Sequence, residues 1–152
     1  PRQRGRAEIP GTVPRGYNQF ADAATEYRMT GRQGSNWGDG IPVDVTPELM
    51  ELGRERYTIN CEVCHGAVGQ GNGFTTKFGM AAVANLHDPR IVAMADGEIF
   101  NTITWGKGTM MGYGNQVTPD QRWAIISYIR ALQRSQNVAA KDLPEELRKQ
   151  LK

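Results

Sequence analysis

Long apolar runs and a one-sided charge are both missing from this chain of 152 residues. No stretch approaches the roughly 18–20 apolar residues that a membrane-spanning helix needs, so we predict no transmembrane span. The formal net charge is only +2 and the pI about 8.8, well short of the basic profile of nucleic-acid-binding proteins. The sequence shows no internal repeat. Its length and a hydrophobic content of 39% predict one compact domain with a modest core.

Cysteine is also scarce, because Cys61 and Cys64 are the only two in the chain. They lie three positions apart, and His65 follows directly in the sequence Cys-Glu-Val-Cys-His. Two thiols at this spacing can each form a thioether with one vinyl group of a porphyrin, and the adjacent imidazole can coordinate its iron. The motif therefore predicts one covalently bound haem c with His65 as proximal iron ligand, and it indicates an electron-handling protein.

Three other interpretations of the cysteine pair are weaker. A thioredoxin-like redox site requires a βαβ setting, and the chain shows no alternation of strand and helix patterns. A structural zinc site takes four Cys or His ligands. If His65 is reserved for the haem iron, only His87 can join the two cysteines, which leaves the set one ligand short. A plain disulfide would leave His65 unexplained.

Two predicted helices frame the motif. Thr46-Pro47-Glu48 places an N-cap residue before a proline at the first helical position, and it predicts a helix that runs up to Cys61. Thr118-Pro119-Asp120 repeats this signal, and apolar residues at helical spacing predict a second helix of about 14 residues. A shorter helix is predicted over residues 96–104, and residues 143–148 are expected to form a short exposed helix. The inward residues of the shorter helix are Ile99, Phe100 and Ile103.

The first 45 residues differ from the rest in composition. They begin with a basic stretch rich in Pro and Gly, and residues 31–40 are rich in Gly, Asn, Asp and Ser. Scattered apolar side chains such as Tyr27 and Trp37 indicate an extended segment that lies along another protein. The predicted organisation is an extended N-terminal arm over 1–45, a monohaem domain over 46–134 and a C-terminal tail over 135–152.

Residues 47–133 resemble the class I cytochromes c, which have an all-α fold around one covalent haem. More narrowly, the chain is similar to the monohaem cytochrome c subunit of bacterial alternative complex III, a quinol:electron-acceptor oxidoreductase. The stretches that carry the narrower likeness are IPGTVPRG at 9–16, GRERY at 53–57 leading into the haem motif, GTM at 108–110, and DQRWAI at 120–125 with YIRALQ at 128–133.

The resemblance implies a methionine as the sixth iron ligand, downstream of His65. Met110 and Met111 lie in a glycine-rich stretch, residues 106–114, that we predict to be a loop. In related cytochromes the ligand is commonly followed by Pro and then, two positions later, by an aromatic residue. We prefer Met110, because Met111 then occupies the Pro position and Tyr113 the aromatic one. The departure from Pro leaves Met111 as the alternative.

The resemblance also implies a helix crossing and a pocket. The first and last helices of class I cytochromes cross where a small residue faces an aromatic one, and Gly53, Tyr57 and Tyr128 supply that contact. Trp105 or Tyr113 is a candidate hydrogen-bond donor to a haem propionate. Side chains that we expect to be buried around the haem are Tyr57, Phe74, Leu86, Trp105, Tyr113 and Ile125. Cations expected to form a rim that steers an acidic partner are Lys77, Arg90, Lys107 and Arg122.

The function implied is one-electron transfer, and the chain is not expected to be an enzyme by itself. It would be a peripheral subunit of a membrane quinol-oxidising complex, respiratory or photosynthetic, that includes a multihaem cytochrome. It would pass electrons to a terminal oxidase or a soluble carrier. Covalent haem attachment takes place outside the bacterial cytoplasm, so we expect a processed protein at the periplasmic face of the cytoplasmic membrane. A lipid-bearing cysteine upstream of Pro1 is compatible with this placement.

Three alternatives stay open. A diffusible periplasmic cytochrome c would gain little from a long N-terminal arm. A cytochrome c subunit of a terminal oxidase would be recognised by the oxygen-reducing partners that co-purify with it. A haem enzyme or gas sensor would need a distal site that opens, with His87 as a switching ligand, yet the sequence around His87 indicates a turn and an exposed side chain.

Overall fold

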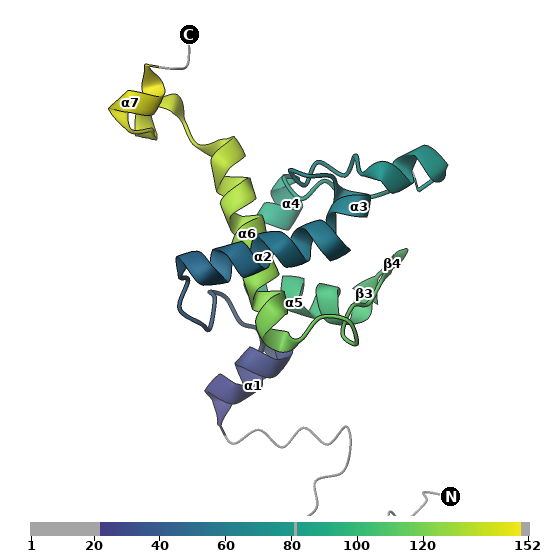
Figure 1. The fold of residues 1–152 in the computed structure, drawn as a ribbon. Coiled ribbons are helices and arrows are strands. Elements are labelled where there is room, and N and C mark those ends of the chain that lie inside the picture. The colour runs from purple at the N-terminus through teal and green to yellow at the C-terminus, as the bar shows by residue number, and fades with distance from the viewer. Residues whose placement is uncertain (1–21, 81, 150–152) are drawn as a thin grey trace, which may run out of the picture.

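The computed structural model describes residues 22–80 and 82–149, and this part of the chain is mostly helical, as the all-α prediction requires (Figure 1). The helices in chain order are α1 (Ala23–Thr30), α2 (Pro47–Asn60), α3 (Glu62–His65), the 3-10 helix η1 (Phe74–Phe78), α4 (Pro89–Val92), α5 (Asp96–Trp105), α6 (Pro119–Asn137), the 3-10 helix η2 (Ala140–Asp142) and α7 (Glu145–Arg148). Two antiparallel hairpins pair β1 (Arg32–Gln33) with β2 (Asn36–Trp37), and β3 (Gly106–Lys107) with β4 (Met110–Met111).

Helices α2 and α6 begin where the sequence predicts. The Thr46 hydroxyl accepts a hydrogen bond from the Leu49 N–H at 3.2 Å, and Pro47 is the first residue of α2. The Thr118 hydroxyl accepts from the Gln121 N–H at 3.4 Å, and the Thr118 N–H donates to the Gln121 side chain at 3.0 Å. Helix α6 has 19 residues rather than about 14, because polar helix formers continue it beyond the last apolar residue of its stripe.

Helices α2 and α6 cross at Gly53, as expected (Figure 1). A Cβ at Gly53 would lie only 2.1 Å from the Ala124 carbonyl oxygen and 3.1 Å from the Tyr128 Cβ. One turn further on, the rings of Tyr57 and Tyr128 pack at a centroid distance of 5.4 Å. The absence of a side chain at Gly53 therefore allows the two backbones to approach closely and places the end of α2 over the core.

Replacing Gly53 with alanine is expected to lower the free energy of unfolding of the haem-loaded protein by about 1–3 kcal/mol, the usual cost of overpacking. The better helix propensity of alanine would alone stabilise α2 by roughly 1 kcal/mol. A net loss of stability in the variant would therefore be caused by the clash of the new methyl group with α6. Denaturant unfolding measures it. Glu55→Ala, at an exposed position of the same helix, should change the value by no more than about 0.5 kcal/mol. Equal stability of the two variants would contradict the crossing.

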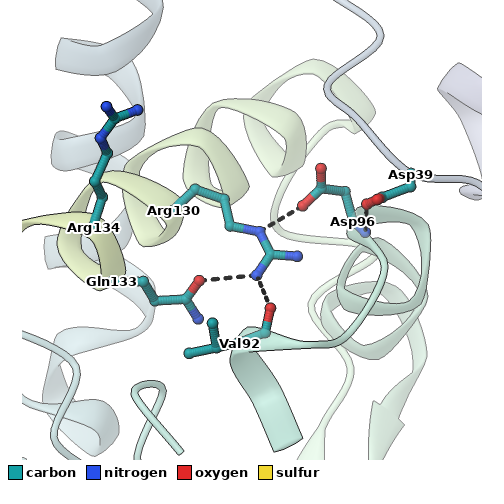
Figure 2. A pocket seen from close by; sticks show the side chains of 6 residues that line it. All are labelled: Asp39, Val92, Asp96, Arg130, Gln133 and Arg134. Atoms are coloured by element: carbon teal, nitrogen blue, oxygen red, sulfur yellow. Dashed lines mark hydrogen bonds and ion pairs between the residues drawn. The ribbon is translucent and has the colours of Figure 1, made fainter. Parts of the chain in front are cut away.

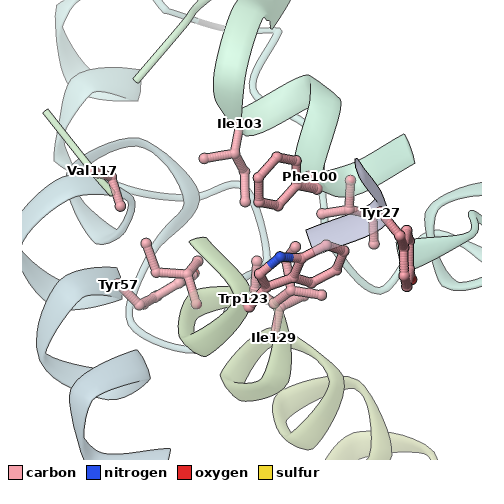
Figure 3. Packing of buried hydrophobic residues seen from close by; sticks show 10 residues of the cluster. Tyr27, Tyr57, Phe100, Ile103, Val117, Trp123 and Ile129 are labelled. Carbon is pink, nitrogen blue, oxygen red and sulfur yellow. The ribbon is translucent and has the colours of Figure 1, made fainter. Parts of the chain in front are cut away.

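The core is built around Trp123 of α6 (Figure 3). Its ring stacks on Phe100 at a centroid distance of 4.6 Å and meets Tyr27 edge to face at 5.3 Å. Ile99, Phe100 and Ile103 of α5 are all buried, which confirms the inward face predicted for that helix. The other members of the buried cluster are Tyr57, Val117, Ile125, Ile126 and Ile129.

Residues 22–45, which we predicted to be part of an extended arm, pack onto the domain instead. Tyr27 of α1 is 6% exposed within the core. The indole N–H of Trp123 donates to the Arg28 carbonyl at 2.7 Å. This packing could not be predicted from the spacing of apolar residues, because an eight-residue helix with one buried aromatic has no apolar periodicity. The part of the predicted arm over 1–21 lies outside the described residues and stays a prediction.

The segment after α1 is held by the start of α5. The Gly40 N–H donates to the Asp96 carboxylate at 3.0 Å, and the Gly97 N–H donates to the Gly38 carbonyl at 2.9 Å. A Cβ at Gly97 would lie 1.9 Å from the Gly31 carbonyl oxygen, so the two backbones are in direct contact. The folded unit therefore begins by residue 22 and not at residue 46.

The C-terminal segment forms the short exposed helix that we predicted. Helix α7 forms within residues 143–148 and is exposed, with Leu147 at 48%. Helix α6 passes the predicted boundary at residue 135 and ends at Asn137. No helix within 22–80 and 82–149 is long and apolar enough to cross a membrane.

Candidate haem-binding site

The three residues of the predicted haem motif lie at the junction of α2 and α3. Cys61 ends α2 and precedes α3, and its carbonyl accepts hydrogen bonds from the Cys64 N–H at 3.1 Å and the His65 N–H at 2.8 Å. Positions i, i+3 and i+4 of a helical turn share one face. The turn therefore brings two sulfur atoms and one imidazole to the same side of the chain.

This turn is held against α2 and against the glycine-rich loop that follows it, residues 66–73. Tyr57 is fully buried and donates its hydroxyl to the Gly66 carbonyl at 2.8 Å. Burial raises the pKa of Tyr57 well above its usual range, so the hydroxyl stays protonated and available as a donor. The Gly71 N–H donates to the His65 carbonyl at 2.8 Å. Hydrogen bonds within the protein therefore fix the backbone on both sides of His65.

The His65 ring is held by a backbone carbonyl. Its Nδ1 lies 2.9 Å from the Ala84 carbonyl oxygen, which can only accept, so Nδ1 carries the proton and Nε2 keeps its lone pair. Burial lowers the pKa of His65, although the hydrogen bond to Ala84 acts in the opposite direction. The ring is therefore a neutral imidazole with Nε2 available, the form that coordinates a metal.

The thiols do not resemble a redox-active pair. Burial, followed by the charge of Cys64, raises the pKa of Cys61 to about 12, whereas a disulfide oxidoreductase lowers the pKa of its reactive thiol. Both cysteines are free and half-buried. Among residues 22–80 and 82–149, no group of three or more His, Cys, Asp and Glu side chains is arranged to hold a metal ion. These findings disfavour the thioredoxin-like and zinc interpretations.

The methionine stretch, which we predicted to be a loop, forms a short hairpin. Gly106 pairs with Met111, and Lys107 with Met110. Adjacent residues of a strand point to opposite faces. Accordingly Met111 is 81% exposed, whereas Met110 is half-buried. Only one of the two methionines can therefore face a given side of the hairpin, and Met110 stays the predicted ligand.

Tyr113 connects the hairpin to the haem motif. Its N–H donates to the Ile103 carbonyl at 2.8 Å, which turns the chain back after β4. Burial, followed by interaction with Cys64 and Cys61, raises the pKa of Tyr113, and Tyr113 and Cys61 pack against the same buried cluster. Residues far apart in the sequence are therefore brought to one site.

Four of the six predicted pocket residues lie in or against the buried cluster. Tyr57 and Ile125 belong to it, and Leu86 and Tyr113 pack against it together with Cys61. Their contact with the haem itself stays a prediction.

The other two predicted pocket residues, Phe74 and Trp105, are 61% and 78% exposed on the protein surface, and their contact with the haem stays a prediction. Phe74 begins η1, and its ring packs against Phe78 at a centroid distance of 5.0 Å rather than into the core. Trp105 is the last residue of α5, two positions after the inward-facing Ile103, and residues two apart point to different sides of a helix.

Arg122 is not part of a surface rim, as we had predicted, because it is only 6% exposed. Its guanidinium donates to the Val117 carbonyl at 3.0 Å, the Thr104 hydroxyl at 2.9 Å and the Gly114 carbonyl at 3.2 Å. It also lies 4.9 Å from the centre of the Phe100 ring. Arg122 therefore fixes the two ends of the segment that carries the methionine hairpin. The other predicted rim cations, all exposed, are Lys77, Arg90 and Lys107.

His87 is half-buried and not exposed, which corrects our expectation. Its Nε2–H donates to the Val68 carbonyl at 2.6 Å. Because a carbonyl can only accept, this hydrogen bond engages Nε2 in holding the glycine-rich loop. His87 thus has a structural contact that accounts for its position, and the contact weakens the case for a switching ligand.

The donor set fits a covalent haem with two axial ligands. Cys61 and Cys64 would carry the thioethers, while His65 Nε2 and the Met110 sulfur would take the axial positions. Such a haem supplies one-electron transfer at a raised potential, because sulfur stabilises ferrous iron. The chain itself supplies a fixed imidazole proton on His65, a buried Tyr57 bonded to Gly66 and a hairpin that carries the predicted second ligand.

A family profile described as cytochrome c oxidase, cbb3-type, subunit III matches residues 48–129, more than half of the chain. Comparison with curated protein sequences gave no match. Cytochrome cL from the marine methylotroph Methylophaga aminisulfidivorans is similar with a TM-score of 0.50 and 21% identity, over 95% of this chain and 90% of that one.

A chain of the reducing HAO-like protein complex of Kuenenia stuttgartiensis is similar with a TM-score of 0.52 and 22% identity, over 72% of this chain. The match covers 53% of that protein, so this chain spans about half of its length. At these identities the structural likeness shows the fold alone, which is that of a cytochrome c. Given the family match, the chain binds haem c covalently, and Cys61 and Cys64 are its two cysteines; His65 stays the predicted iron ligand. The chain belongs to the cytochrome c family described as cbb3-type oxidase subunit III.

Proposed function

We propose that this protein is the monohaem electron-transfer subunit of a quinol-oxidising membrane complex of the alternative complex III type. Electron transfer rests on one observation above all, the 2.9 Å contact of His65 Nδ1 with the Ala84 carbonyl, which leaves Nε2 for iron. The family match supports the same chemistry. The assignment to this complex is supported by the likeness of residues 9–16 and 53–57 to the corresponding subunit.

In this proposal the chain is peripheral and lies at the periplasmic face of the cytoplasmic membrane. Electrons arrive from a multihaem cytochrome subunit and leave to a terminal oxidase or a soluble carrier. The exposed rings of Phe78 and Trp105, at 74% and 78%, support a contact with other subunits. Lys77 and Lys107, near these rings in sequence, add positive charge that favours acidic partners.

Co-purification tests the proposal. Membranes of the native host are washed with high salt, dissolved in mild detergent and passed over an affinity column that captures a tag on this chain. We expect one large particle that contains a multihaem cytochrome and oxidises quinol, because a subunit is held by an extensive interface. A diffusible cytochrome would leave the membranes in the salt wash, and this outcome would overturn the proposal.

A second candidate, a cytochrome c subunit of a terminal oxidase, is favoured by the description of the matching family. The same preparation separates the two. An oxidase particle consumes oxygen when it receives electrons from a reduced carrier and contains no quinol-oxidising activity. A particle of the alternative complex III type oxidises quinol and does not reduce oxygen without an added oxidase.

A further inference from the structure

A network of hydrogen bonds from α6 lines the pocket drawn in Figure 2. At its centre, Arg130 Nε donates to the Asp96 carboxylate at 2.7 Å. Its Nη1 donates to the Val92 carbonyl and to Gln133 Oε1, each at 2.9 Å, and its Nη2 donates to the Met94 carbonyl. Asp96 is only 6% exposed, while the Arg130 side chain is 26% exposed, and these four acceptors together hold the guanidinium in one orientation.

Arg130 determines how the Gln133 amide is oriented. A guanidinium can only donate, so the amide atom that faces it is the oxygen. The amide nitrogen is thereby turned to the Leu86 carbonyl, which accepts its hydrogen bond at 2.7 Å. Gln133 is 4% exposed, so little water is present to replace either interaction.

Leu86 lies two residues from the carbonyl that holds the haem ligand. Its N–H donates to the Gly69 carbonyl at 2.7 Å while its own carbonyl is held by Gln133. The Ala84 carbonyl accepts from His65 Nδ1 at 2.9 Å. The segment 84–86 is therefore fixed between α6 and the glycine-rich loop, and its position sets the geometry of the His65 hydrogen bond.

We propose that Gln133, oriented by Arg130, is a positioning residue for the proximal iron ligand. It acts through Leu86 on the Ala84 carbonyl, and so on the strength of the hydrogen bond from His65. A stronger bond at Nδ1 makes Nε2 more basic, and a more basic ligand stabilises ferric iron and lowers the reduction potential. This inference rests on haem attachment and His65 ligation and is independent of membership in any complex.

Gln133→Met tests it in the haem-loaded full chain. Methionine keeps a straight-chain helix former of similar length and the same charge, but it removes the donor to Leu86. We expect the reduction potential to rise, with a change of up to about tenfold in the equilibrium constant for reduction. We also expect faster solvent exchange of the His65 Nδ1–H by NMR. Gln133→Glu, which keeps an acceptor for Arg130 and loses only the donor, should accelerate the same exchange.

Leu132→Ala is the matched control. Leu132 is the preceding residue of α6 and packs against the core cluster, so its loss lowers stability without removing any of these hydrogen bonds. It should leave the potential and the Nδ1–H exchange unchanged. The proposal is overturned if Gln133→Met matches wild type in both the potential and the Nδ1–H exchange rate. It is also overturned if Leu132→Ala, at the same free energy of unfolding as Gln133→Met, changes both quantities by as much as Gln133→Met does. Failure of haem attachment would appear separately, as an unmodified mass.

Discussion

Replacing Met110 with alanine should abolish the sulfur-to-iron charge-transfer band of the ferric protein and lower its reduction potential. We expect a fall of roughly 100 mV or more, within the ~0.8 V range that axial ligands set. Thioether sulfur stabilises ferrous iron, so its removal favours the ferric state. The vacated position should also bind small external ligands such as carbon monoxide. Absorption spectroscopy and a redox titration measure these changes.

Met111→Ala is the control for this prediction, because its side chain is adjacent in sequence and opposite in direction. At 81% exposure it should keep the band, the potential and the closed coordination of the parent protein. Loss of the band in Met111→Ala but not in Met110→Ala would show that the ligand is misassigned. Retention of the band in both single variants would remove the hairpin from the ligand set.

Deleting residues 1–45 is expected to prevent stable folding around the haem. The deletion removes Tyr27 from the core, and truncating a buried aromatic destabilises by about 3–5 kcal/mol. It leaves the Trp123 indole N–H without its acceptor, which adds roughly 1–3 kcal/mol. Together these losses approach the roughly 5–15 kcal/mol of net stability that domains possess. Haem content after co-expression with a maturation pathway, and denaturant unfolding, would show the loss.

Deletion of residues 1–21 is the matched control for this truncation. It keeps α1, the contact of Trp123 with Arg28 and the hydrogen bond from Gly40 to Asp96, so it should retain haem and stability. Tyr27→Ala should give an intermediate loss. A fragment 46–152 with native spectrum and wild-type stability would show that α1 contributes nothing to the fold.

The features that sequence predicted best are those that depend on neighbouring residues. The starts of α2 and α6 are specified by Thr46-Pro47 and Thr118-Pro119, because an N-cap interacts with residues two or three positions ahead. The spacing of Cys61 and Cys64 is set by covalent chemistry and needs no tertiary information. The contact of Gly53 with α6 was also predicted, although only from the likeness to known cytochromes.

The features that sequence could not predict depend on distant partners. The Ala84 carbonyl holds the ring of His65, the predicted haem ligand, but a contact made by a backbone carbonyl cannot be read from the residue type. Arg122 resembles any surface cation, because an arginine is buried only when carbonyls elsewhere in the chain satisfy its guanidinium. Helix α1 was not predicted, because it has a single inward residue, Tyr27, and the burial of that residue depends on its packing against the distant Trp123. Each of these cases requires the fold before its role becomes visible.

The hydrogen bond between His65 and Ala84 has a consequence for the rate of electron transfer. Since the polypeptide, and not the metal, dictates the tilt of the ring, no side chain has to turn when an electron enters or leaves. Fixed dipoles of this kind require little reorganisation at the moment of reaction. Electron exchange with a partner can then proceed rapidly on a small driving force, so that little free energy is dissipated in the transfer.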